Sequence, residues 1–164
     1  MKEQDRMKLL KLLERNAKLT NAQLAAMLGT SEGAVAAEVA SLEREGIIKG
    51  YETMVDWDRT DRNLVSARIE LKVTPKSNMG FEEIAYTVSQ FPEVETCYLM
   101  SGGYDLALTI SGKTFKDIAL FVAHRLAPLD AVQSTSTHFV LKKYKYHGVI
   151  LVGDEKDERE VTSL

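Results

Sequence analysis

The spacing of apolar residues changes once along this 164-residue chain, and the change divides it into two unlike parts. Up to about residue 55, apolar residues recur at spacings of three and four, which is typical of amphipathic helices. From Leu64 to Val73 they alternate with polar residues, as in a strand with one buried face. The polar stretch Asp56–Asn63 separates the two patterns. We therefore expect one domain over 1–56, a linker over 57–63 and a second domain that begins at residue 64.

Three helices are predicted in the first domain. The first lies near Met7–Arg15, and the pair Thr20 and Gln23 fits a capping box that starts the second. Gly29 is placed to end that second helix, and the third runs from about Glu32 to Glu45. Two helices joined by a short turn that contains glycine, after a first helix, predict a helix-turn-helix. The β-branched residues within 47–55 then predict a short strand or wing.

The second domain is predicted to be α+β with the order β-α-β-β-α-β, a ferredoxin-like arrangement. The expected strands are 64–73, 94–100, 104–110 and 132–144, and the expected helices are 79–90 and 115–126. Such a sheet carries helices on one face only, so its other face is left for a partner and a homodimer is expected. We place this domain at 64–147. Residues 148–164 are predicted as a charged tail that is frayed or disordered over 153–160.

Composition narrows the class of protein. The formal net charge is −3, so the chain is not a polycation that holds nucleic acid by charge alone. Cys97 is the single cysteine, which excludes an intrachain disulfide and a cysteine metal cage. No run of about 18 apolar residues occurs, so no membrane association and a cytoplasmic location are expected.

A set of motifs in a fixed order identifies a family. The motifs are Leu24-Ala25, Leu28-Gly29 and Ser31, then Leu42–Ile48, Pro92–Val94, Ser101–Asp105 and Thr135–Thr137. With the winged helix-turn-helix first and the βαββαβ domain second, the chain resembles the Lrp/AsnC (feast/famine) family of transcription regulators from about residue 3 to 144. The resemblance implies a regulator that binds double-stranded DNA, with a RAM-type C-terminal domain that dimerises through its sheets. It also implies higher assemblies such as octamers, and an amino acid or related metabolite bound between dimers.

The same resemblance implies an effector pocket made by the Gly-x-Tyr-Asp turn and the threonines of the last strand. The candidate residues are Ser101, Gly102, Gly103, Tyr104, Asp105, Thr135 and Thr137. Their chemistry suits an amino acid, because Asp105 can hold an ammonium and hydroxyl groups can bind a carboxylate. The alternative is that Gly102-Gly103 is only a hairpin turn and that the Asp105 carboxylate only satisfies nearby backbone amides.

The third helix departs from the family pattern. No Lys or Arg occurs between Ser31 and Leu42, and Glu38 stands where the family carries arginine. Residues 1–60 hold nine Lys and Arg against ten Asp and Glu, a net charge of −1. Three interpretations remain open. Each subunit could bind DNA weakly, with the overall affinity raised by avidity across an oligomer. Residues that flank the helix could make the contacts, or the module could have lost DNA binding. The candidate contacts are Lys18, Ser31, Ser41, Arg44 and Lys49.

An enzyme is the main rival, because siroheme decarboxylases share this two-part fold. The lone histidines His124, His138 and His147 have no metal-ligand spacing, and no catalytic set is seen. We therefore expect no enzyme activity, no cofactor, no metal and no catalytic residue. The basic and aromatic segment Lys142–Tyr146 is either a nucleic-acid surface or the end of the last strand, with solvated charges and packed tyrosines. The sequence favours the strand end.

Overall fold

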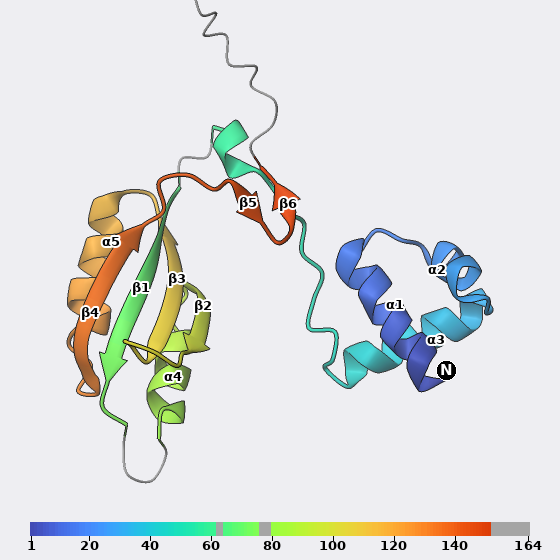
Figure 1. The fold of residues 1–164 in the computed structure, drawn as a ribbon, viewed down its shortest axis with the longest axis horizontal. Coiled ribbons are helices and arrows are strands. Elements are labelled where there is room, and N and C mark those ends of the chain that lie inside the picture. Colours follow the sequence, from blue (N-terminus) through green and yellow to red (C-terminus); the bar gives the residue numbers. More distant parts are fainter. Residues whose placement is uncertain (62–63, 76–79, 152–164) are drawn as a thin grey trace, which may run out of the picture. The chain divides into compact units, whose positions relative to one another are not determined.

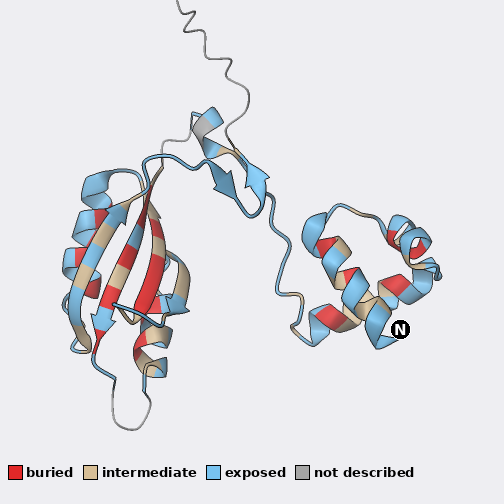
Figure 2. Ribbon diagram, in the orientation of Figure 1, coloured by how far each residue is buried: buried red, intermediate tan, exposed pale blue. Residues whose placement is uncertain are grey.

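The computed structural model describes residues 1–61, 64–75 and 80–151, which divide after Val55 into two compact units. Each unit has its own hydrophobic core (Figure 2). The predicted change of hydrophobic period therefore coincides with a change of core.

The N-terminal unit consists of three helices: α1 (Glu3–Arg15), α2 (Asn21–Leu28) and α3 (Glu32–Arg44). The predicted capping box is present, since Thr20 Oγ1 accepts from the Gln23 N–H and Gln23 Oε1 accepts from the Thr20 N–H. Gly29 follows α2 in the left-handed conformation at φ 64°, which favours glycine. The core residues are Leu9, Leu13, Leu24, Ala25, Val35 and Leu42. Together they bring all three helices onto one core.

The strand expected over 47–55 does not form. The Ile47 side chain is 52% exposed, whereas Ile48 packs against the helical core. A strand needs the backbone of a neighbouring strand, and residues 1–55, all of which are described, contain none. The segment is held instead through a side chain, because the Tyr51 hydroxyl donates to Glu43 Oε1 at 2.9 Å.

The C-terminal unit has the predicted βαββαβ order (Figure 1). Its elements are β1 (Val65–Val73), α4 (Glu82–Ser89), β2 (Val94–Leu99), β3 (Leu106–Gly112), α5 (Phe115–Phe121) and β4 (Val132–Phe139). A short 3-10 helix, η1 (Trp57–Arg59), precedes them, and a π-helical turn, η2 (Val122–Leu126), continues α5. The sheet is antiparallel with the order β2-β3-β1-β4, so the ferredoxin-like fold is confirmed. Met79, where the first helix of this unit was predicted to begin, lies outside the described residues.

Among the described residues, helices cover one face of this sheet and none covers the other. The alternate residues Ala67, Ile69, Leu71 and Val73 of β1 are buried as predicted and share a core with Ile84 and Val88 of α4 and Ile118 and Phe121 of α5. Figure 2 shows this buried row along β1 and β3. Burial of each large aliphatic side chain contributes roughly 1.5–3 kcal/mol, so the row fixes the register of β1.

The last strand is shorter than predicted. It ends at Phe139, and the final hydrogen bond to β1 is the Val140 N–H donating to Ser66 O at 2.8 Å. Residues 141–144 are described, but they form no strand in this sheet. The chain then forms a separate hairpin from β5 (Lys145–Tyr146) and β6 (Val149–Ile150). The predicted disordered tail over 153–160 lies outside the described residues.

Candidate functional site

The outer face of α3 is a stripe of exposed residues with mostly small side chains. Ser31 caps the helix, since its Oγ accepts from the Ala34 N–H at 3.2 Å. Gly33, Ala37 and Arg44 are exposed and lie four and seven residues apart, while Val35 and Leu42 are buried on the opposite side. Arg44 is therefore the single cation on a surface otherwise made of small side chains.

Glu38 does not belong to that stripe. Its carboxylate lies 3.3 Å from Arg6 Nε on α1 and 3.4 Å from the Met1 amino group, and its side chain is only 14% exposed. Glu38, which stands where the family carries arginine, is therefore turned toward α1 and away from the exposed stripe. One position along a helix rotates a side chain by about 100°, so Glu38 faces α1 while Ala37 faces outward.

Glu45 at the end of α3 completes the link to α1. It accepts from Ser41 Oγ at 2.8 Å and is also paired with the Arg6 guanidinium. The hydrogen bond from Ser41, followed by that from Arg6, lowers the pKa of Glu45 below its ordinary value of 4.5. Glu45 in turn raises the pKa of Arg6. Arg6 thus bridges Glu38 and Glu45 and is directed at α3 instead of solvent.

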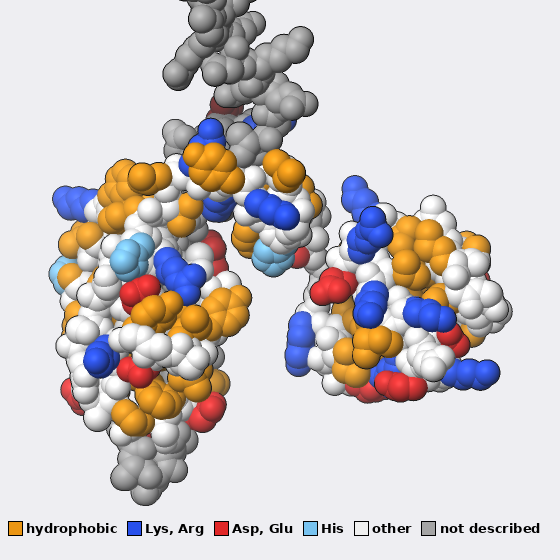
Figure 3. Space-filling model, viewed as in Figure 1, with side chains coloured by type: hydrophobic (Ala, Val, Ile, Leu, Met, Phe, Trp, Pro, Cys, Tyr) orange, Lys and Arg blue, Asp and Glu red, His pale blue; other side chains and the backbone are white. Residues whose placement is uncertain are grey.

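Of the predicted DNA contacts, Ser31, Ser41 and Arg44 belong to α3 or its cap, whereas Lys18 precedes α2 and Lys49 follows α3. Lys18, Ser31, Arg44 and Lys49 are exposed, whereas Ser41 is half-buried with its hydroxyl bonded to Glu45. Lys49 folds back toward the end of α3, because its Nζ lies 2.9 Å from where a side chain at Gly46 would begin. On the face drawn in Figure 3, basic side chains of this unit are interspersed with acidic and hydrophobic ones.

The turn 101–105, which joins β2 to β3, contains the predicted effector residues of the Gly-x-Tyr-Asp motif. Ser101, Gly102 and Gly103 are exposed, and a side chain at either glycine would meet no atom within 4 Å. Asp105 is bound to β1 through two hydrogen bonds, since its Oδ2 accepts from the Val73 N–H at 2.8 Å and its own N–H donates to Leu71 O. The Tyr104 hydroxyl accepts from the Arg68 guanidinium at 2.9 Å.

The two threonines of β4 lie at the same end of the sheet as this turn but on a different face. Thr135 and Thr137 pair with Leu71 and Ile69, and their side chains therefore point to the helix-covered side. Tyr104 reaches Arg68, which lies on the uncovered side. Strand β1 lies between the turn and β4 in the sheet, and Tyr104 is on the opposite face from the two threonines.

The uncovered face also carries a polar cluster that sequence reasoning missed. His138 Nε2 lies 3.5 Å from Glu70 Oε2 and 3.1 Å from Ser136 Oγ. The alternation of residues in β1 already predicted that Arg68 and Glu70 share one face. Which residues of β4 lie beside them depends on the pairing of the two strands, in which Glu70 is opposite Ser136 and Arg68 is opposite His138. That pairing joins residues far apart in the sequence, so the sequence around His138 did not indicate this cluster.

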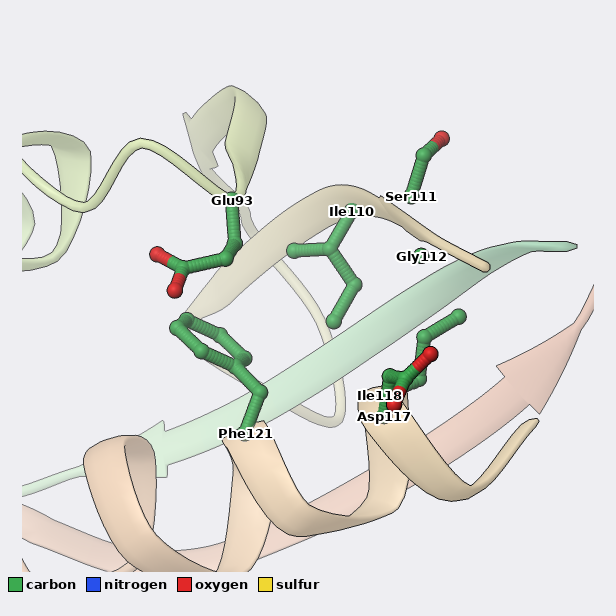
Figure 4. Close-up of a pocket in the computed structure, with 7 residues that line it drawn as sticks. All are labelled: Glu93, Ile110, Ser111, Gly112, Asp117, Ile118 and Phe121. Carbon is green, nitrogen blue, oxygen red and sulfur yellow. The ribbon is translucent and has the colours of Figure 1, made fainter. Parts of the chain in front are cut away.

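A pocket lies elsewhere, between the start of β2, β3 and α5 (Figure 4). It is lined by Glu93, Ile110, Ser111, Gly112, Asp117, Ile118 and Phe121, none of which belongs to the predicted set. Glu93 Oε1 is 3.9 Å from Arg125 Nη1, and Glu93 Oε2 is buried with no hydrogen-bond partner among the described residues. Asp117 is occupied locally, since its Oδ2 accepts from the Thr114 N–H as part of a helix cap.

Metal sites and membrane spans are both absent over residues 1–61, 64–75 and 80–151. In those ranges no three His, Cys, Asp or Glu side chains are grouped so that they could hold a metal ion. No helix there is both long and apolar enough to span a bilayer.

Comparison with known proteins assigns the two units. The profile of the Lrp/AsnC ligand binding domain matches residues 66–150, and that of a winged helix-turn-helix DNA-binding domain matches residues 6–49. The chain is 42% identical over 94% of both lengths to the uncharacterized HTH-type transcriptional regulator YugG of Bacillus subtilis. It is 27% identical to the leucine-responsive regulatory protein of Haemophilus influenzae, over 84% of this chain and 82% of that one.

A solved structure of similar fold is the complex of the Neisseria meningitidis transcriptional regulator NMB0573 with L-Met. The two are 25% identical with a TM-score of 0.70, over 92% of this chain and 97% of that one. The matched proteins and domains are those of transcription regulators and not of enzymes, which confirms the expectation that this chain is not an enzyme. The chain is therefore a DNA-binding transcriptional regulator of the Lrp/AsnC family.

Proposed function

We propose that this regulator acts in the cytoplasm as a homodimer or higher assembly, such as an octamer, and that an amino acid bound by its C-terminal unit controls it. The observation that carries the proposal is the match of residues 66–150 to a ligand binding domain. A relative solved with L-Met and a relative described as leucine-responsive support an amino acid as the effector.

The chemistry of the turn 101–105 is compatible with such a ligand. The Asp105 carboxylate is fixed by the Val73 amide through one oxygen, so it offers a preoriented negative charge to an ammonium. The glycines beside it leave the backbone open to close approach. Thr135 and Thr137 would bind the carboxylate of the ligand through their hydroxyl groups.

A second subunit is needed to complete this pocket. The turn and the two threonines are separated by β1, and Tyr104 lies on the other side of the sheet from the threonines. If residues of both kinds hold one ligand, they must come from different subunits. This requirement links binding of the effector to assembly, because the ligand binds only where two subunits meet.

In the N-terminal unit, we propose that DNA is contacted by Lys18, Ser31, Arg44 and Lys49, whereas the Ser41 hydroxyl, which was also predicted, already donates its hydrogen to Glu45. Ser31 uses its oxygen to cap α3, but its hydroxyl hydrogen is still available to a phosphate. Arg44 and Lys49 supply positive charge near the end of α3, and Lys18 supplies it before α2. With so few cations, avidity across the assembly would supply the remaining affinity.

The effector is tested by isothermal titration of the twenty amino acids into the full-length protein, followed by Asp105→Asn. The amide oxygen of asparagine can still accept from the Val73 N–H, whereas the charge that attracts an ammonium is removed. We expect at least a tenfold weaker affinity, which corresponds to about 1.4 kcal/mol. Light scattering with and without the ligand reports its effect on assembly.

The control is Asp130→Asn, which removes one exposed carboxylate from the loop before β4. It should bind the ligand as the wild type does. Equal affinity in Asp105→Asn and the wild type would exclude Asp105 from the pocket. Absence of binding for all twenty amino acids would exclude that class of effector.

A further inference from the structure

The hairpin β5–β6 and the residues before it form an exposed surface that the helix-turn-helix does not include. We call Lys142, Lys143, Tyr144, Lys145, Tyr146 and His147 the hairpin surface; all six are exposed. The hairpin turns at His147 and Gly148, with φ of 43° and 83°. Positive φ at both central residues is the requirement of a tight type I′ turn, which holds the two short strands in register.

The hairpin surface carries positive charge and no negative charge. No Asp or Glu occurs between Asp130 and Asp154, although the whole chain has a net charge of −3. Among the described residues, no carboxylate lies within ion-pair distance of Lys142, Lys143 or Lys145. The three lysines are therefore not neutralised by any acidic side chain in that part of the chain.

Tyr144 and Tyr146 lie beyond β4, which ends at Phe139, so the long strand that the sequence favoured does not reach them. Tyr144 is 65% exposed and Tyr146 is 43% exposed. Lys142 Nζ lies 5.5 Å from the centre of the Tyr144 ring, and Lys143 Nζ lies 5.8 Å from that of Tyr146. The rings thus support the lysine side chains and leave the ammonium groups in solvent.

We infer that the hairpin surface binds the phosphate backbone of duplex DNA, as a second contact outside the helix-turn-helix. The α3 stripe offers a single cation, and residues 1–60 carry a net charge of −1. Most of the affinity of a protein for DNA comes from cations that neutralise phosphates, and three lysines without an acidic neighbour among the described residues meet that need. A second copy of this hairpin is a poor occupant, because it would place lysines against lysines.

The test compares two charge-matched variants of the full-length protein. Lys142→Gln/Lys145→Gln removes two cations from the hairpin surface, and Lys113→Gln/Lys116→Gln removes two exposed cations near the start of α5. Fluorescence anisotropy measures binding to a labelled duplex from the protein's own upstream region and to an unrelated duplex, between about 50 and 200 mM salt. Lys142→Arg/Lys145→Arg restores the charge and controls for damage to the hairpin.

The hairpin variant is expected to bind both duplexes at least threefold more weakly. The slope of log affinity against log salt should fall by roughly 0.9 for each phosphate that the variant no longer neutralises. The control variant and the arginine variant should match the wild type. Binding to phosphate does not depend on sequence, so the weakening should be equal for the two duplexes.

Three results would overturn the inference. The first is an unchanged affinity and salt slope in the hairpin variant. The second is an equal weakening in the α5 control, which would mean that only net charge matters. The third is unchanged DNA binding with an altered molar mass by light scattering, which would make the surface an interface between copies of the chain. Failure of the amino-acid proposal would leave each of these results unaffected, because no effector is present in the assay.

Discussion

The Glu38 carboxylate on α3 lies 3.3 Å from Arg6 Nε on α1, and this ion pair bridges the two helices. Arg6 also pairs with Glu45, the residue that follows α3, and Glu45 in turn accepts a hydrogen bond from Ser41. Glu38 and Glu45 therefore link the end of α3 to α1 through Arg6 and are not part of the exposed stripe of Gly33, Ala37 and Arg44.

Glu38→Arg is accordingly expected to destabilise the N-terminal unit. The new guanidinium would stand against Arg6 and leave two cations side by side where an ion pair existed. Thermal denaturation should give the order wild type, then Glu38→Gln, then Glu38→Arg, from highest to lowest midpoint. A Glu38→Arg protein that is as stable as the wild type and binds DNA more tightly would contradict the orientation of Glu38.

Ala37→Arg is the substitution that should strengthen DNA binding. Ala37 lies on the exposed stripe of α3 with Gly33 and Arg44, so a new cation there would point outward. We expect tighter binding to an unrelated duplex and a salt slope that is steeper by about 0.9 for one additional neutralised phosphate. Ala119→Arg on the exposed side of α5 adds the same charge and should leave the slope unchanged. Equal effects of the two substitutions would show that α3 does not face DNA.

The lowered pKa of Glu45 predicts a dependence of stability on pH. A carboxyl whose pKa is lower in the folded state binds fewer protons than in the unfolded state, so it stabilises above its ordinary pKa of 4.5. That stabilisation disappears as the pH falls through the lowered folded value. The melting midpoint should therefore differ less between about pH 6 and pH 3.5 in Glu45→Gln than in the wild type. Because the pair is exposed, the effect should shrink in high salt, and a difference equal to that of the wild type would disprove the link.

Local signals account for what the sequence predicted well. Thr20, Gln23 and Gly29 fix the ends of α2 through bonds within a few residues, and all of them act as predicted. The alternation in β1 specifies its buried face for the same reason. The wing, the end of β4 and the direction of Glu38 depend on which backbone or side chain lies opposite. Those partners are distant in sequence, and no short-range pattern reports them.

The hairpin β5–β6 illustrates the same limit and permits a local test. Its signal was the pair His147-Gly148 between two short apolar and aromatic segments, which is weaker than an Asn-Gly turn. Gly148→Ala places a side chain at φ 83°, where the cost is about 1–2 kcal/mol. Hydrogen exchange should therefore quicken roughly five- to thirtyfold at Leu151, whose N–H donates to Tyr144 O. Amides of β1 should keep their protection, because a two-stranded hairpin opens independently of the sheet. Gly50→Ala is the control, because Gly50 has no positive φ, and it should change the exchange rate neither at Leu151 nor in β1. Unchanged exchange at Leu151 in Gly148→Ala would mean that the turn does not hold the hairpin together.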